Sequence, residues 1–155
     1  MITEELNSIA ELGGIFLDIE QRFNGLDYTE PLTEFQETIA KGEQAAFDGQ
    51  REPGGSPWAP LSPVTVAKKG HSTILFETGA LKASLVTVGG PNNINAVASR
   101  GSLFGTSDEK ALFHTEGTSR MPARPPVGTN DEDVDGLTES LADHAVDGLI
   151  FKVGG

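Results

Sequence analysis

The spacing of hydrophobic and polar positions predicts two long helices. Residues 29–47 follow a Thr29–Pro31 start signal and should form a helix that stops before Gly49. Its apolar stripe consists of Leu32, Phe35, Ile39 and Ala46. A final helix should begin at Thr129 or Asn130 and end at Gly148, with acidic residues in its first turn. Its stripe consists of Val134, Leu137, Leu141 and Ala145.

The N-terminal segment allows more than one interpretation. Residues 1–12 carry apolar side chains at nearly helical spacing, which indicates either a short packed helix or an arm that becomes ordered on assembly. Gly13 and Gly14 interrupt this pattern. Residues 15–23 then alternate between apolar and polar positions and predict a half-buried strand, with a helix as the competing interpretation.

Several short β-prone runs follow in the second half of the chain. Residues 85–88 and 94–99 flank a turn rich in Gly, Pro and Asn, which predicts a β-hairpin with a longer loop. Residues 102–105 fit a third strand, and Ser107–Glu109 should begin a short helix. Residues 149–153 are expected to form an edge strand or a tail that pairs with a neighbour.

Together these elements predict an α+β fold. A small, mainly antiparallel sheet should pack against the long helix of residues 29–47, beside an acidic C-terminal helix and long Pro/Gly-rich loops. Residues 50–56 and 115–129 are the two loops predicted by composition. In the second loop, Pro125–Pro126 favours an extended geometry that suits docking into a groove of a neighbour.

Residues 57–85 hold the densest set of packing signals. Ser62–Pro63 reads as an N-cap followed by proline at the first helical position, and Thr78 reads as a second N-cap. The apolar run 74–76 is expected to be a buried strand or extended segment. Trp58, the one tryptophan, should anchor this region on the long helix; an interface hot spot is the alternative.

Composition limits the class of protein. A chain of 155 residues fits one domain, residues 1–155, in which 1–12 is a possible arm and 13–153 the main folded part. The absence of cysteine excludes disulfides and thiolate metal sites. No apolar run approaches the length of a membrane span, and the acidic N-terminus disfavours a secretory signal.

The net charge of −12 is unevenly distributed. Residues 50–125 carry eight basic and five acidic side chains, whereas both flanking regions are strongly acidic. This distribution disfavours nucleic-acid binding, which needs cations facing phosphates. It favours contacts between the acidic ends of one copy and the basic middle of another. Simple solubilisation by the acidic ends is the alternative.

Chemistry-bearing residues do not form a recognisable site in the sequence. His71, His114 and His144 do not follow a metal-binding spacing, and His114 has no nucleophile motif beside it. We therefore expect no enzymatic activity, no cofactor and no metal; a small hydrolase built on His114 is the weakest alternative. His114 itself is expected to be a packed or capping residue at a helix end, in its cationic form.

Four segments in order resemble the phage virion-morphogenesis family, the tail-completion proteins of Mu-like phages. They are W-x-P-L-S-x-x-T-x-x-x-K from Trp58, I-L-x-x-T-G-x-L-x-x-S from Ile74, A-L-F-H-x-x-G-T from Ala111 and P-A-R-P-x-x-G from Pro122. With the acidic helix that follows, the resemblance covers about residues 47–146. Pro126 stands where the family usually has an aromatic residue.

The resemblance implies a structural virion protein of the head–tail junction, acting in tail completion, as a neck part or as a tail terminator. It implies a ring, commonly sixfold, located in the tail or neck of the virion and assembled in the host cytoplasm. Expected partners are other copies of the chain, the head–tail connector and tail tube or sheath proteins, with DNA as passing cargo and no membrane. A soluble protein-binding module using the Arg124-Pro125-Pro126 loop is the alternative.

The expected interface draws on the central segment and on the acidic start of the last helix. Arg120 and Arg124 are expected either to pair with carboxylates of a neighbour or to be solvated. The full set of interface candidates is Trp58, Leu61, Lys68, Lys69, Arg120, Arg124, Pro125, Asp131, Glu132 and Asp133.

Overall fold

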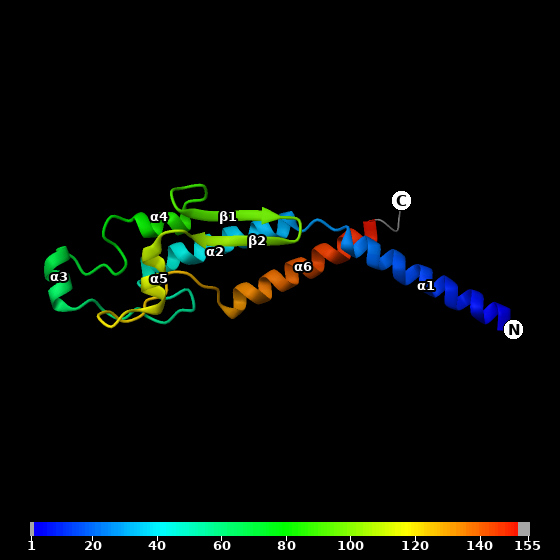
Figure 1. Ribbon diagram of the computed structural model, residues 1–155, viewed down its shortest axis with the longest axis horizontal. Helices are drawn as coiled ribbons and strands as arrows, with labels where there is room; N and C mark the ends of the chain where they lie inside the picture. Colours follow the sequence, from blue (N-terminus) through cyan, green and yellow to red (C-terminus); the bar gives the residue numbers. More distant parts are fainter. Residues whose placement is uncertain (1, 152–155) are drawn as a thin grey trace.

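Helix α2 (Thr29–Gly49) runs along the middle of the molecule, and most other elements pack around it (Figure 1). The computed structural model describes the backbone of residues 2–151 and the side chains of residues 11–150. Over this range the predicted α+β class is confirmed, with six helices and one two-stranded antiparallel sheet. The other elements are α1 (Ile2–Asn24), α3 (Pro63–Lys69), α4 (Ala80–Val86), β1 (Asn93–Ala98), β2 (Gly101–Thr106), α5 (Glu109–Glu116) and α6 (Asp131–Phe151).

The main core lies between α2, α4 and the central loops. Leu85 is fully buried, and the other members of the cluster are Phe47, Trp58, Ile74, Leu81 and Ala111. Leu32, Ile39 and Ala46 of the predicted α2 stripe are also buried. Burial of this stripe is the dominant stabilising contribution expected for α2, because helix propensity alone is weak in water.

The β1–β2 hairpin packs on α2 through hydrogen bonds as well as apolar contact. Gln36 of α2 is buried, and its Nε2 donates to the carbonyls of Ala96 (2.9 Å) and Leu103 (3.0 Å). On the other side, the hydroxyl of Thr106 donates to the Ser84 hydroxyl of α4 (2.8 Å). The small sheet is therefore held between α2 and α4, as the predicted packing against the long helix requires.

The prediction of a strand over residues 15–23 was wrong. These residues belong to α1, which continues through Gly13 and Gly14 and extends away from the body at the end opposite α3 (Figure 1). Ile15, Ile19 and Phe23 fit the spacing of a helix as well as the alternation of a strand. The pattern alone therefore could not distinguish a helix from a strand. Each glycine costs a helix only about 0.5–1 kcal/mol relative to alanine, too little to break it. The side chains of residues 1–10 lie outside the described residues.

The predicted pairing of residues 85–88 with 94–99 was also wrong. Leu81, Ser84 and Leu85 recur at helical spacing on one buried face, and this burial extends α4 to Val86. The hairpin instead joins β1 to β2, with Ala98 opposite Gly101. The third predicted strand, residues 102–105, is thus the true partner of β1.

Gly148 does not end the final helix, and residues 149–151 are helical rather than a strand. A Cβ at Gly148 would come within 2.5 Å of Leu26 Cδ2. Glycine therefore serves here to let the buried Leu26 side chain approach the helix closely. Residues 152–153 of the predicted run lie outside the described residues.

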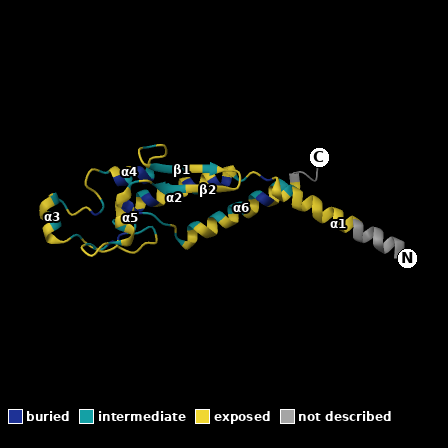
Figure 2. Cartoon of the chain, in the orientation of Figure 1, coloured by how far each residue is buried: buried dark blue, intermediate teal, exposed yellow. Residues whose placement is uncertain are grey.

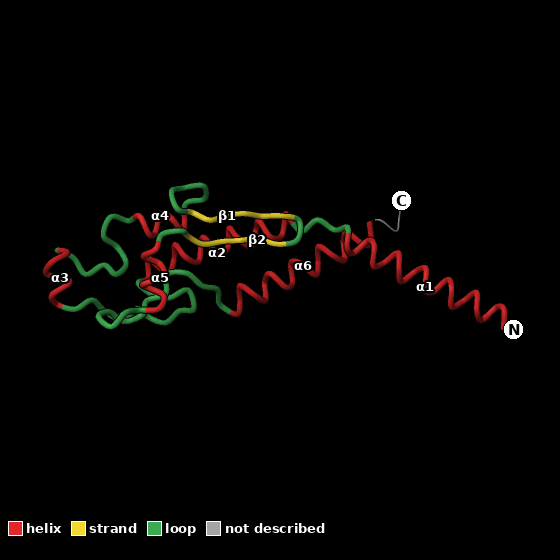
Figure 3. Tube along the Cα trace, in the orientation of Figure 1, coloured by secondary structure: helices red, strands yellow, loops and turns green. Residues whose placement is uncertain are grey.

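Three predicted helix caps are confirmed by their hydrogen bonds. Ser62 Oγ accepts from the Thr65 amide (3.2 Å), and Asp108 Oδ1 accepts from the Lys110 amide (3.0 Å). Asn130 Oδ1 accepts from the Asp133 amide (2.8 Å), while Asp133 Oδ2 accepts from the Asn130 amide (3.1 Å). Thr78 Oγ1 accepts from Ala80 at the start of α4 (3.3 Å), but Gly79 occupies the cap position. These caps fix where the loops of the central region begin and end (Figure 3).

Gly117, at the end of α5, is expected to tolerate no side chain. Its φ is +72° with ψ at −178°, a region that is essentially restricted to glycine, and a Cβ would lie 2.7 Å from the Ala123 amide nitrogen. Gly117→Ala should therefore lower the free energy of unfolding by about 2–3 kcal/mol in chemical denaturation. Gly89→Ala is the control, because Gly89 shares the φ of +72° but has open space around it. Equal losses for the two variants would contradict the steric argument.

Candidate assembly surfaces

The two segments around Trp58 and Arg124 lie against each other. Trp58 packs edge-on against Phe47 of α2, with ring centroids 5.4 Å apart, and its Nε1 donates to the Pro125 carbonyl (3.0 Å). Arg124 donates from Nε to the Ala59 carbonyl (2.6 Å) and from a terminal nitrogen to the Pro60 carbonyl (2.9 Å). The loop of residues 118–128 is thereby fastened to the segment around Trp58, and that segment to α2.

Arg124 is neither a solvated surface residue nor a free partner for a neighbour's carboxylate. Its exposed fraction is 5%, and its guanidinium satisfies backbone carbonyls of its own chain. Trp58 is buried as the predicted anchor, and Pro126 is fully buried in the place where an aromatic residue was expected. The Arg124-Pro125-Pro126 loop thus turns two of its three side chains inward, which removes the surface that the binding-module alternative needed.

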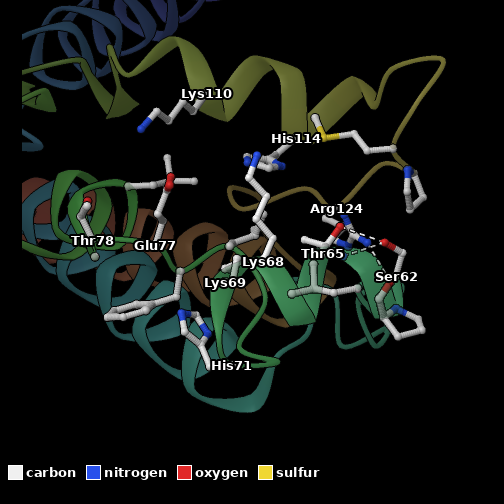
Figure 4. A pocket seen from close by; sticks show the side chains of 18 of the residues that line it. Ser62, Thr65, Lys68, Lys69, His71, Glu77, Thr78, Lys110, His114 and Arg124 are labelled. Atoms are coloured by element: carbon white, nitrogen blue, oxygen red, sulfur yellow. Dashed lines mark hydrogen bonds between the residues drawn. The ribbon is translucent and has the colours of Figure 1, made fainter.

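A cleft lies beside the loop of residues 118–128, between α3, α5 and the turn before α4. Its volume is about 830 Å³. Five cationic side chains line it together with Leu61: Lys68, Lys69, Lys110, Arg120 and Arg124. Glu77 is the acidic residue in its wall. Figure 4 shows Lys68 and Lys69 projecting from α3 and Lys110 and His114 from α5 around this space. We refer to it as the basic cleft.

His114 sits in the wall of the basic cleft in a different state from the one expected. Burial lowers the pKa of its imidazole, and the positive charge of Arg124 lowers this pKa further. The His114 carbonyl accepts from the Arg124 amide (2.6 Å), so the residue helps to position the loop. The neutral imidazole is favoured, which corrects the prediction of a cationic His114 at the helix end.

The acidic start of α6 presents part of its charge to solvent. Asp131 and Glu132 are exposed, whereas Asp133 is half-buried and occupied by the reciprocal cap with Asn130. None of the three lines the basic cleft of its own chain. The predicted acidic and basic interface residues therefore form two separate surfaces. Trp58 and Pro125 lie in the structure behind the basic one, and Arg124 lies in its wall.

Glu43 is a buried carboxyl group that the sequence analysis did not single out. Its exposed fraction is 1%, and its Oε1 accepts from the Gly128 amide (3.0 Å). Burial raises the pKa of Glu43 to about 8, and the nearby charge of Asp133 acts in the same direction. Glu43 lies seven residues after Gln36 and four after Ile39. The position of a charged residue on the apolar stripe of α2 was the feature of the sequence that could have indicated a buried carboxyl group.

A comparison with protein families adds the deciding observation. The model of the phage virion morphogenesis family matches residues 14–145, which is most of the chain. The chain belongs to this family. Comparisons with curated proteins and with solved structures found no match. The matched range of the virion morphogenesis family includes the fastened loops, the basic cleft and most of α6.

Membership of the virion morphogenesis family assigns the protein a role in building the phage particle. Within residues 2–151, no helix has both the length and the apolar character to cross a membrane. Histidine and acidic side chains of the described residues do not gather in groups of three that could hold a metal ion.

Proposed function

We propose that this protein is a structural, non-enzymatic component of the head–tail junction, where copies of the chain close into a ring that joins or finishes the tail. Family membership supports a role in virion assembly. The separation of charge supports the finer assignment. Five cations surround one cleft in a chain whose net charge is −12.

The proposed ring contact joins the basic cleft of one copy to the acidic start of α6 in the next. Asp131 and Glu132 are exposed at the tip of a helix, and Lys68 and Arg120 are exposed at the cleft. A contact between two different surfaces is heterologous, and it closes a ring when the rotation between copies is right. The cleft is of the size that commonly receives a protruding group.

The same charge distribution suits a ring through which DNA passes. In this proposal the remaining acidic faces of α6 flank the channel and repel the phosphate backbone, so DNA moves through without binding. The head–tail connector and the tail tube or sheath proteins are the proposed neighbours above and below the ring. The fold then serves shape recognition and self-assembly rather than chemistry.

A charge reversal in the basic cleft tests the ring contact. Lys68→Glu should weaken self-association at least tenfold, because it places like charges opposite Asp131 and Glu132. Sedimentation or light scattering over a dilution series measures this effect. Lys41→Glu, an identical change on the exposed side of α2, is the control and should leave association unchanged. Mixing the Lys68→Glu protein with an Asp131→Lys protein should restore assembly. Unchanged association in Lys68→Glu would contradict the proposed contact.

A further inference from the structure

Helix α1 carries an apolar stripe that the other described residues leave largely exposed. Its five side chains recur at helical spacing and are each between 45% and 69% exposed (Figure 2): Leu12, Ile15, Phe16, Ile19 and Phe23. A continuous exposed apolar surface of this kind marks an interaction site. Gly13 and Gly14 lie within the same helix and weaken it, so a partner that covers the stripe would also stabilise α1.

A second apolar surface lies where α1 joins the body. It is a groove of about 600 Å³, formed largely by one face of α6 and by the residues that link α1 to α2. Its apolar wall includes Leu141, Ala142, Val146, Leu149, Phe23 and Tyr28. Phe23 belongs to both the stripe and the groove. The two surfaces are therefore continuous at Phe23.

The base of α1 is fixed to the body by hydrogen bonds. A terminal nitrogen of Arg100 donates to the Asn24 carbonyl (2.8 Å), and the Tyr28 amide donates to the Ser99 carbonyl (2.9 Å). Because α1 is one continuous helix, Leu12 lies roughly 16 Å further along the axis than Phe23. The stripe thus projects beyond its own groove and cannot fold back into it (Figure 1).

We infer that the apolar stripe of α1 in one copy packs into the groove along α6 in a second copy, so that each copy contributes one α1 helix and receives one. We refer to this as the arm contact. This inference rests on the proposed self-association and names a second surface for it. Every copy has one stripe and one groove, so reciprocal exchange satisfies both. Exchange of an identical element is also a low-cost route to assembly.

Area and charge both fit a second copy as the occupant. Phe side chains bury roughly 150–250 Å² each, and the stripe holds two of them beside three aliphatic side chains. These side chains are still about half exposed, so two reciprocal contacts together approach the roughly 1,200–2,000 Å² of total area that a stable interface buries. Glu20, which is exposed beside the stripe, would meet Arg100, the cation that lines the groove.

Cross-linking between copies of different size tests this contact directly, because the natural chain has no cysteine. One copy carries Ile15→Cys in the stripe, and a longer, tagged copy carries Ala142→Cys in the groove. Mild oxidation of the mixture should give a disulfide-linked species containing one of each. Gln21→Cys, on the opposite face of α1, replaces Ile15→Cys as the control and should cross-link at least tenfold less. Equal cross-linking from Ile15 and Gln21, or none from either, overturns the inference.

A pair of matched variants separates this contact from the charge contact. Phe16→Asp should weaken self-association at least tenfold, whereas Gln21→Asp adds the same charge on the opposite face and should change it little. If Phe16→Asp assembles normally while Lys68→Glu does not, the arm contact fails and the proposed ring contact stands. If Lys68→Glu assembles normally while the Ile15–Ala142 cross-link forms, the proposed ring contact fails and the arm contact stands. Disulfides between two Ile15→Cys arms alone would show that α1 packs on α1 and would overturn docking in the groove.

Discussion

Replacing Trp58 with alanine is expected to lower the free energy of unfolding by about 3–5 kcal/mol. The ring is buried against Phe47, and its Nε1 donates to the Pro125 carbonyl, so truncation leaves a cavity and an unpaired carbonyl together. A loss of this size is comparable with the whole stability of many domains. Urea denaturation followed by far-ultraviolet circular dichroism measures it, since the chain has no other tryptophan to report by fluorescence.

Two further variants identify the cause of the loss. Trp58→Phe keeps an aromatic ring but removes the hydrogen bond to Pro125, and it should cost about 1–3 kcal/mol. Phe113→Ala truncates an aromatic side chain that is 52% exposed, and it should cost less than about 1 kcal/mol. A Trp58→Ala protein as stable as Phe113→Ala would show that Trp58 does not hold the central loops on α2.

The second large effect is a dependence of stability on pH that originates at Glu43. Its pKa is about 8 in the folded chain against an ordinary value of 4.5, so the folded state binds one more proton than the unfolded state between these pH values. The contribution of Glu43 to stability is therefore largest below pH 4.5 and falls as the pH rises through this window. The slope is roughly 1.4 kcal/mol per pH unit, and the total loss is about 3–5 kcal/mol by pH 8.5.

Glu43→Gln should remove this dependence. The amide keeps an acceptor for the Gly128 amide and carries no charge, so the variant should be more stable than the natural chain above pH 7 and similar to it near pH 5. Thermal melts across pH 5–9 measure the difference. The charge of Asp133 and the low pKa of His114 are the same in both proteins, so the difference isolates Glu43. Glu37→Gln, at an exposed position of α2, is the control; parallel curves for Glu43→Gln and the natural chain would contradict the buried, protonated state.

Local signals in the sequence were enough to locate most helix starts. A cap acts through a side chain and an amide two or three residues away, so Ser62, Asp108 and Asn130 could be recognised without knowing the fold. The α2 stripe was predictable for the same reason, because helical spacing is itself local.

Features that depend on distant contacts were not predictable in this way. Residues 85–88 are β-prone, yet burial of Leu81 and Leu85 in the core keeps this region helical to Val86. Arg124 and Glu43 are charged residue types that usually lie at the surface. Their burial depends on partners 65 and 85 residues away, the Ala59 carbonyl and the Gly128 amide.

The N-terminal helix shows a different limit. Apolar residues from 15 to 23 fit both a strand and a helix, and burial in their own chain does not decide between them, because these side chains are exposed. The proposed second copy supplies the missing contact. Four of the interface candidates line the cleft: Leu61, Lys68, Lys69 and Arg120. The three basic ones could be predicted together because the basic residues are concentrated in the middle of the sequence.

The mass of the purified protein by light scattering, at low and high salt, tests the central claim of self-assembly most directly. We expect one discrete multimer at low salt that shifts to smaller species as the salt concentration is raised. Screening acts over about 10 Å at 0.1 M salt and about 3 Å at 1 M, so a contact between exposed charges weakens in that range. A monomer at every protein concentration and at both salt concentrations would show that the chain does not self-assemble.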